Sequence, residues 1–181
     1  MVKIRRVPQT GLRIEAMMET PQRTLVRSGD RAASVRSIRL DMPELMGGTD
    51  QGLMPLEALL GAYAGSLNLV GNFVAKTMDF DLRNWEFTIW AEFDPRGIYG
   101  LAKVPKALRV IHVDARVSTR EPDRRLAQLR KLIAERCPVH NLLKAAGVRF
   151  KEDWRRIPAD GSPVTAAKSN SRKPTAIKLK E

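Results

Sequence analysis

The sequence holds few side chains that could do chemistry, and the most reactive is its single cysteine, Cys137. One cysteine excludes an intramolecular disulfide and a cysteine-rich zinc site. His140 follows three residues later, and a Cys-x-x-His pair can ligate a metal. Two ligands do not complete a site, however, and Pro138 disturbs the helical spacing between them. The other histidine, His112, lies in a predicted strand, so we expect no metal and no cofactor.

The motifs that bind nucleotides or perform acyl transfer do not occur in the sequence. It has no G-x-G-x-x-G, no P-loop and no nucleophile elbow. Gly47, Gly48 and Gly52 are therefore interpreted as turn glycines.

The segment that carries Cys137 is predicted to be a helix. Ser118 or Thr119 offers an N-cap, Glu121 fits a capping box, and Pro138 ends the helix. Four residues at i, i+3, i+7 and i+11 form one stripe, so Cys137 is expected on the side that faces the core. The stripe consists of Leu126, Leu129, Ile133 and Cys137.

A longer helix is predicted from Pro55 to Thr77, with large apolar residues on one side and small residues on another. The small residues are Gly61, Ala62, Ala64 and Gly65. Such a helix is usually buried against two neighbours. Its uncharged stretch, 58–75, is just short of the roughly 20 apolar residues that a membrane span needs and contains polar side chains. We therefore expect a buried core helix and no membrane partner.

The remaining elements are predicted to be short strands, turns and one short helix, which gives an α+β fold with strands flanking two long helices. Asp94–Gly97 is a turn by composition, and strict alternation marks the strand over 85–93. The other predicted strands are 12–18, 24–27, 35–40, 108–117 and 148–150, and a short helix is predicted over 139–146.

The positive charge lies mainly at the two ends of the chain. The 32 basic and 20 acidic residues leave +12, of which residues 1–40 carry +6 and residues 161–181 carry +4. We expect one domain over residues 1–158 and a basic, disordered tail over residues 159–181. The N-terminus is charged and lacks the apolar core of a secretory signal, which indicates a cytoplasmic protein.

Several segments resemble one known family in the same order along the chain. The block GGTDQGLMPLEALL, residues 47–60, resembles the loop and helix start of the OsmC/Ohr family, the osmotically inducible proteins and organic hydroperoxide reductases. The strand 85–93, the turn 94–97 and the segment Glu135–Val139 fit the same template, so the resemblance spans residues 10–150. It implies the OsmC-like fold, with antiparallel sheets around two long central helices. It also implies an intertwined homodimer with pockets at the subunit interface.

The resemblance assigns two positions to the family's redox cysteines. In such proteins the first, peroxidatic cysteine lies eleven residues after the helix-start proline, which is the position of Ser66 here. The second cysteine lies in a Cys-Pro-Val element and matches Cys137. A serine hydroxyl cannot be oxidised to a sulfenic acid, so the two-cysteine cycle within one subunit is excluded.

The residues that assist the first cysteine are matched only in part. The family's glutamate directly follows the proline in the hydroperoxide reductases, whereas here Leu56 follows it and Glu57 comes next. The assisting arginine comes from the N-terminal strands, and the sequence does not choose between Arg13 and Arg23.

Three functions remain open at this stage. The first is an OsmC/Ohr-like protein of the hydroperoxide-detoxification group, whose peroxidase activity, if it has one, is weak, uses Cys137 and needs an external thiol reductant. The second is a non-catalytic dimeric module that binds a small apolar ligand in the interfacial pocket, with Ser66 in contact. The third is nucleic-acid binding through the basic termini, which is disfavoured because Trp154 is the only aromatic residue beyond Phe150.

Overall fold

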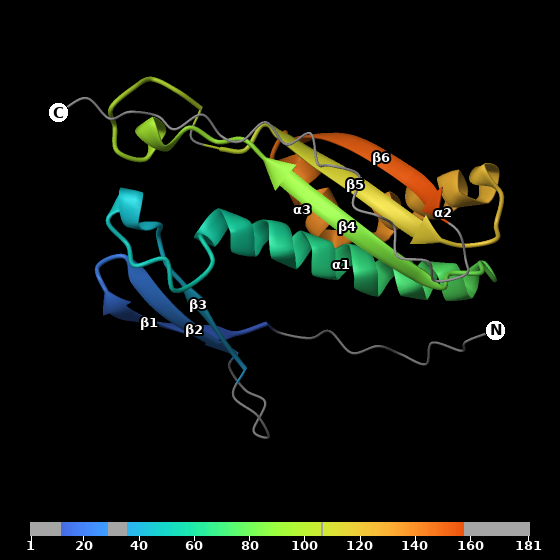
Figure 1. Cartoon of the computed structure of the whole chain (residues 1–181), viewed down its shortest axis with the longest axis horizontal. Helices are drawn as coiled ribbons and strands as arrows, with labels where there is room; N and C mark the ends of the chain where they lie inside the picture. The colour runs from blue at the N-terminus through green and yellow to red at the C-terminus, as the bar shows by residue number, and fades with distance from the viewer. Residues whose placement is uncertain (1–11, 29–35, 106, 158–181) are drawn as a thin grey trace.

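Two three-stranded sheets lie on either side of a long helix (Figure 1) in the computed structural model, which describes residues 12–28, 36–105 and 107–157. The expected α+β class is confirmed. The strands are β1 Ile14–Thr20, β2 Arg23–Ser28, β3 Ser37–Leu40, β4 Asn84–Ala91, β5 Val110–Ser118 and β6 Arg149–Ile157. The helices are α1 Pro55–Thr77, α2 Asp123–Arg136 and α3 Pro138–Ala145, with 3₁₀ turns η1 Glu44–Met46 and η2 Pro95–Gly97. The start of the predicted strand 35–40 and the tail 159–181 lie outside the described residues.

The second sheet is mixed, and its connection places Cys137. β4 pairs with β5 antiparallel, whereas β5 pairs with β6 parallel. A parallel pair needs a crossover, and α2 and α3 supply it between β5 and β6. Cys137 lies at the junction of these two helices, so the crossover holds it against the sheet and α1.

The last strand is longer than the alternation predicts. We expect 148–150, but β6 runs from Arg149 to Ile157 alongside all of β5. Its inward positions alternate Phe150, Glu152 and Trp154, which are partly buried. Glu152 interrupts the apolar alternation of the sequence, and for this reason the predicted strand ends before the observed one.

Helix α1 has the predicted bounds, and one chain covers only one of its sides. Tyr63, Leu67 and Val74 are buried against α2, α3 and β4. The small face is exposed at Gly61, Ala62 and Gly65. In the most apolar 18-residue stretch of the helix, only 28% is buried within the chain. Leu69 and Phe73 are exposed as well, at 74% and 42%. Among the described residues, α1 alone is long and apolar enough to cross a membrane, by length and composition. One chain therefore covers one side of this helix and leaves the other open.

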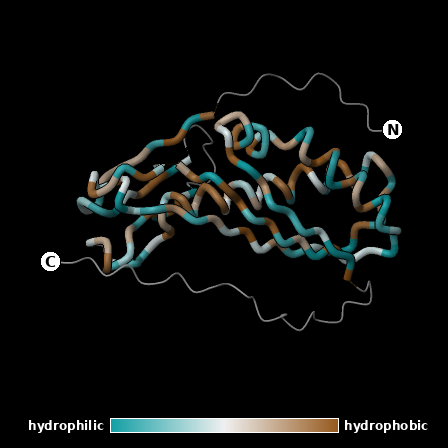
Figure 2. Tube along the Cα trace, turned by 90° about the horizontal axis from the view of Figure 1, so that it is seen from above, coloured by the Kyte–Doolittle hydropathy of each residue, from teal (hydrophilic) through white to brown (hydrophobic). Residues whose placement is uncertain are grey.

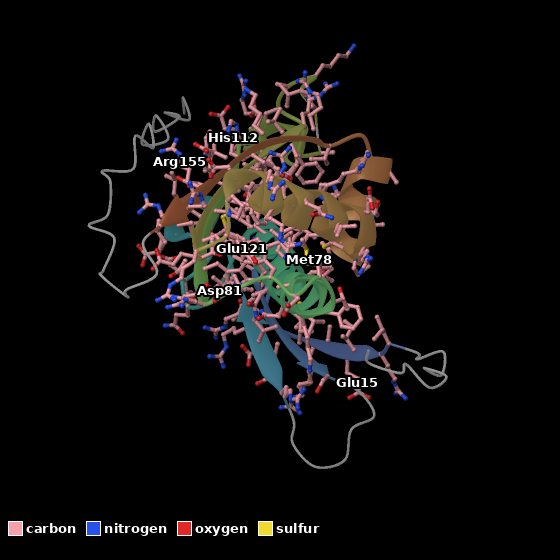
Figure 3. The ribbon with its side chains drawn as sticks, turned by 90° about the vertical axis from the view of Figure 1, so that its right-hand side faces the viewer. Glu15, Met78, Asp81, His112, Glu121 and Arg155 are labelled. Atoms are coloured by element: carbon pink, nitrogen blue, oxygen red, sulfur yellow. The ribbon has the colours of Figure 1, made fainter. Side chains whose placement is uncertain are left out.

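The predicted capping box of α2 is wrong. The helix begins at Asp123 after Pro122, with no side-chain cap, and Ser118 belongs to β5. The Glu121 carboxylate instead accepts from the backbone N–H of Asp81 and pairs with Arg125. Arg125 also donates to the carbonyls of Met78 and Asp79, which ties α2 to the end of α1. Figure 3 shows Met78, Asp81 and Glu121 gathered at this junction.

In the N-terminal sheet the edge strand β1 is exposed, whereas most of β2 is partly buried. Ile14 and Met18 are 66% and 77% exposed, and in β1 only the last residue is partly buried. The first described residue, Leu12, is 95% exposed, and the tube in Figure 2 has the brown colour of hydrophobic residues at this end. The apolar side chains of β1 are therefore not buried within one chain.

Candidate functional site

The centre of the candidate site is a contact between Ser66 and Cys137. Ser66 Oγ lies 3.1 Å from Cys137 Sγ, and either atom can be the donor. Cys137 is fully buried as the end of the α2 stripe, and the prediction that it faces the core is confirmed. Ser66 is half-buried on α1. The two positions that the resemblance assigns to redox cysteines are thus adjacent across the α1–α3 contact.

Cys137 also links the backbones of α2 and α3. Its N–H donates to the carbonyl of Ile133 at 2.8 Å, which closes the last turn of α2. Its Sγ accepts from the backbone N–H of His140 at 3.4 Å, within the first turn of α3. Pro138 permits this arrangement because the first position of a helix needs no N–H donor. The sulfur therefore lies between a hydroxyl group and a helix N-terminus.

A second polar pair lies one helical turn away from the first. Tyr63 is three residues before Ser66, His140 is three residues after Cys137, and Tyr63 Oη lies 3.0 Å from His140 Nδ1. Burial raises the pKa of Tyr63, with smaller contributions from the charges of Glu152 and Cys137. Burial lowers the pKa of His140. Both groups are therefore neutral at neutral pH.

Sequence reasoning missed this second pair because it considered His140 only as a metal ligand. The signal was present: polar residues spaced i, i+3 on two helices that share one packed contact. Among the described residues, no group of three or more His, Cys, Asp or Glu side chains could hold a metal ion.

Glu57 lies away from the sulfur. Its carboxylate accepts from the backbone N–H of Met54 at 2.9 Å, which caps the start of α1. Glu57 and Ser66 are nine residues apart on one helix, a rise of about 13 Å. Within one chain, Glu57 therefore stabilises the helix and does not reach Cys137.

The two candidate arginines have different partners. Arg13 pairs with Glu15 at 3.1 Å, on the surface of β1. Arg23 donates to Thr49 Oγ1 at 3.3 Å and Gln51 Oε1 at 3.0 Å. Arg23 is therefore fixed to the loop that precedes α1, which makes it the better placed of the two to act near that helix.

The loop before α1 is organised by Asp41, a buried carboxylate that the sequence analysis does not single out. Asp41 accepts from Thr49 Oγ1 at 2.6 Å and from the backbone N–H groups of Met42, Thr49 and Gln51. These hydrogen bonds, the one from the Thr49 side chain above all, lower the pKa of Asp41.

Two of the turn glycines are required by close backbone approach in this loop. A Cβ at Gly48 would lie 1.8 Å from the Met42 carbonyl oxygen, and one at Gly52 would lie 2.5 Å from that of Arg39. The interpretation of these residues as structural glycines agrees with this geometry.

The comparisons with known proteins identify one family. A family model described as OsmC-like protein matches residues 48–153, more than half of the chain. No curated protein matches the sequence. The segment before residue 48 lies outside the family match, although the solved structures below cover more than four fifths of the chain.

Solved structures of low sequence identity share the fold. An OsmC-like protein from Mycoplasma pneumoniae has 17% identity and a TM-score of 0.69, over 83% of this chain and 99% of that one. An organic hydroperoxide resistance protein OsmC from Legionella pneumophila has 17% identity and a TM-score of 0.63, over 82% and 98%. The organic hydroperoxide resistance protein OhrB of Bacillus subtilis has 20% identity and a TM-score of 0.53, over 81% and 98%. Together with the family match, this shows that the chain belongs to the OsmC-like protein family.

Proposed function

We propose that this protein belongs to the hydroperoxide-stress group of its family and acts through one sulfur, Cys137. The observation that carries the proposal is the 3.1 Å contact between Ser66 Oγ and Cys137 Sγ. The site keeps the adjacency that a two-cysteine cycle requires but replaces one sulfur with oxygen. A single thiol restricts the chemistry to oxidation of Cys137 and its reduction by a separate thiol.

The reaction has three balanced steps. The Cys137 thiolate attacks the distal peroxide oxygen, the O–O bond breaks, and after one proton is taken up an alcohol and a cysteine sulfenic acid result. A free thiol then displaces water from the sulfenic acid and forms a mixed disulfide. A second free thiol attacks the reductant sulfur of that mixed disulfide, and the Cys137 thiolate is released. The two reductant thiols leave joined by a disulfide bond.

The burial of Cys137 makes this route slow. The side chain is 0% exposed, so peroxide and reductant reach the sulfur only when the α1–α3 contact opens. In this chain Glu57 caps α1 and does not contact the sulfur. The Ser66 hydroxyl can donate to the thiolate and stabilise its charge, but it cannot supply a second redox equivalent.

Wild-type protein should reduce cumene hydroperoxide in the presence of dithiothreitol with a turnover below about 1 s⁻¹, the low end of enzyme rates. Cys137→Ser should abolish this turnover because the chain holds no other thiol. Peroxide consumption is measured under identical conditions for both proteins and for a protein-free control. Turnover that survives in Cys137→Ser would contradict the proposal.

We also propose that the working form is a homodimer. The exposed face of α1 combines small residues with Leu69 and Phe73, and small residues allow the close approach of a second helix. In the chain itself a Cβ at Gly65 would meet nothing within 4 Å. Gly65→Leu therefore tests the partner surface, because its side chain starts from a position that is open within the subunit.

Native mass spectrometry and sedimentation should give a dimer for the wild type and at least about tenfold weaker association for Gly65→Leu. Circular dichroism should show that the variant keeps its secondary structure. A monomeric wild type would exclude the proposed dimer. A dimer that Gly65→Leu leaves unchanged would show that its interface is not the exposed face of α1.

A non-catalytic role in binding a small apolar ligand is the second candidate, and a hollow between α1 and β4 favours it. This hollow has a volume of about 240 Å³, with Leu60, Phe87 and Ile89 among its lining residues. It borders the exposed small face of α1, so a second subunit would close it. A small molecule retained by the dimer in native mass spectra, together with no peroxide turnover, would favour this role over the peroxidase.

A further inference from the structure

A larger hollow is lined by residues of α2, α3 and the start of β6. This α2–α3 groove has a volume of about 1130 Å³. Its lining includes Ala127 and Ala134 of α2, together with Val148 and Phe150 at and beside the start of β6. These side chains form an apolar wall wide enough for a small organic molecule.

The charged residues along the groove leave two cations without a carboxylate partner. Two pairs neutralise each other, and these are Arg130–Glu152 at 3.2 Å and Lys131–Glu135 at 4.0 Å. Lys144 and Arg149 also line the groove, and neither forms an ion pair with a described residue. The groove therefore has an excess of two positive charges beside its apolar wall.

His140 can add a hydrogen-bond donor to the groove. The residue lines the groove yet is only 7% exposed, and its ring stacks on Phe150 at 4.2 Å between centroids. Nδ1 is already hydrogen-bonded to Tyr63 Oη in the core. A phenol is a stronger acid than a neutral imidazole, so we assign the donor role to Tyr63. Nε2 then carries the proton, and the ring edge away from Tyr63 can offer this N–H to the groove.

We propose that the α2–α3 groove is a binding site for a small organic carboxylate with an aromatic or aliphatic body. Lys144 and Arg149 attract the carboxylate, the His140 Nε2–H donates to it, and the apolar wall takes the body. A carboxylate fits better than a bare inorganic anion because most of the groove wall is hydrocarbon. Ser66 and Cys137 do not line the groove, and the binding site does not depend on the proposed peroxidase activity.

The two histidines provide the test, because each gives one ring Hε1 resonance in proton NMR of the full-length protein. His112 lies on the second sheet, stacked on Trp90, and does not line the groove. His112→Gln assigns the two signals by removing one. Titration with 4-phenylbutanoate should shift the His140 signal along a saturating curve with a dissociation constant of about 1 mM. The His112 signal should not shift.

Two controls separate recognition of the carboxylate from apolar adhesion. The neutral 4-phenylbutan-1-ol should shift the His140 signal at least about tenfold more weakly. The double variant Lys144→Gln, Arg149→Gln should weaken 4-phenylbutanoate binding about tenfold, and the matched surface variant Lys151→Gln should leave it unchanged. Equal effects of the acid and the alcohol, or an unchanged His140 signal at about 10 mM acid, would overturn the proposal.

Discussion

Ser66→Cys should raise hydroperoxide turnover at least about 100-fold above the wild-type rate, because it changes an intermolecular resolving step into an intramolecular one. Ser66 is half-buried while Cys137 is fully buried, so the introduced thiol is the more accessible nucleophile. Its sulfenic acid would form beside Cys137, which then displaces water and closes a disulfide. The present Oγ–Sγ distance of 3.1 Å is about 1 Å longer than an S–S bond, and the longer C–S bond of cysteine reduces this difference.

Matched variants show whether position or mere thiol number produces the gain. Ala62→Cys places a thiol on the exposed face of the same helix, away from Cys137, and should not reproduce the gain. Ser66→Cys combined with Cys137→Ser should lose most of the gain because no resolving sulfur remains. Peroxide consumption with dithiothreitol measures all four proteins. A gain of equal size in Ala62→Cys would contradict the role of the Ser66–Cys137 contact.

Gly71→Ala should destabilise the protein by about 1–3 kcal/mol, although alanine normally stabilises a helix. Gly71 is buried on α1, where a Cβ would lie 1.9 Å from Cη2 of Trp85 and 2.8 Å from two further atoms of its six-membered ring. The Trp85 indole is itself held by a 2.8 Å hydrogen bond from Nε1 to Asn68 Oδ1, so it cannot move aside freely. Chemical denaturation measures the loss in the free energy of unfolding.

The double variant Gly71→Ala, Trp85→Phe isolates the contact. Phenylalanine lacks the ring atoms that the new methyl group meets, so the double variant should be more stable than the sum of the two single effects predicts. A coupling of about 1 kcal/mol or more is expected for residues in direct contact. Additive effects would show that Gly71 is required for another reason.

The sequence predicts α1 well because several signals agree. Pro55 starts the helix, the large apolar residues recur at helical spacing, and the structure has the predicted bounds of 55–77. Cys137 is placed correctly for a similar reason, since its stripe continues through a helix that Pro138 must end. Where spacing and a helix breaker coincide, local physics determines the element.

The errors arise where tertiary contacts replace local ones. Glu121 has the spacing of a capping box, but Asp81 and Arg125 compete for its carboxylate and Pro122 starts the helix instead. Strand β6 extends beyond its predicted end because Glu152 points inward, where Arg130 and the Trp154 indole satisfy its charge. A single sequence does not reveal such partners from other elements.

The candidate site was predictable by position but not by geometry. The resemblance assigns Ser66 and Cys137 to one site, and the structure brings their side chains into contact. Tyr63 and His140 join them only through the packing of α1 on α3, which spacing within each helix does not specify. The small-residue pattern of α1 predicts a second packing neighbour, which one subunit alone does not supply.

Trapping the oxidised sulfur tests the central claim most directly. Wild-type protein is treated with one equivalent of cumene hydroperoxide and dimedone, which reacts with sulfenic acids, and its intact mass and peptides are then measured. The single-sulfur mechanism predicts one dimedone adduct per chain, located on Cys137, and none in Cys137→Ser. Peroxide consumption by the wild type with Cys137 left unmodified would contradict it.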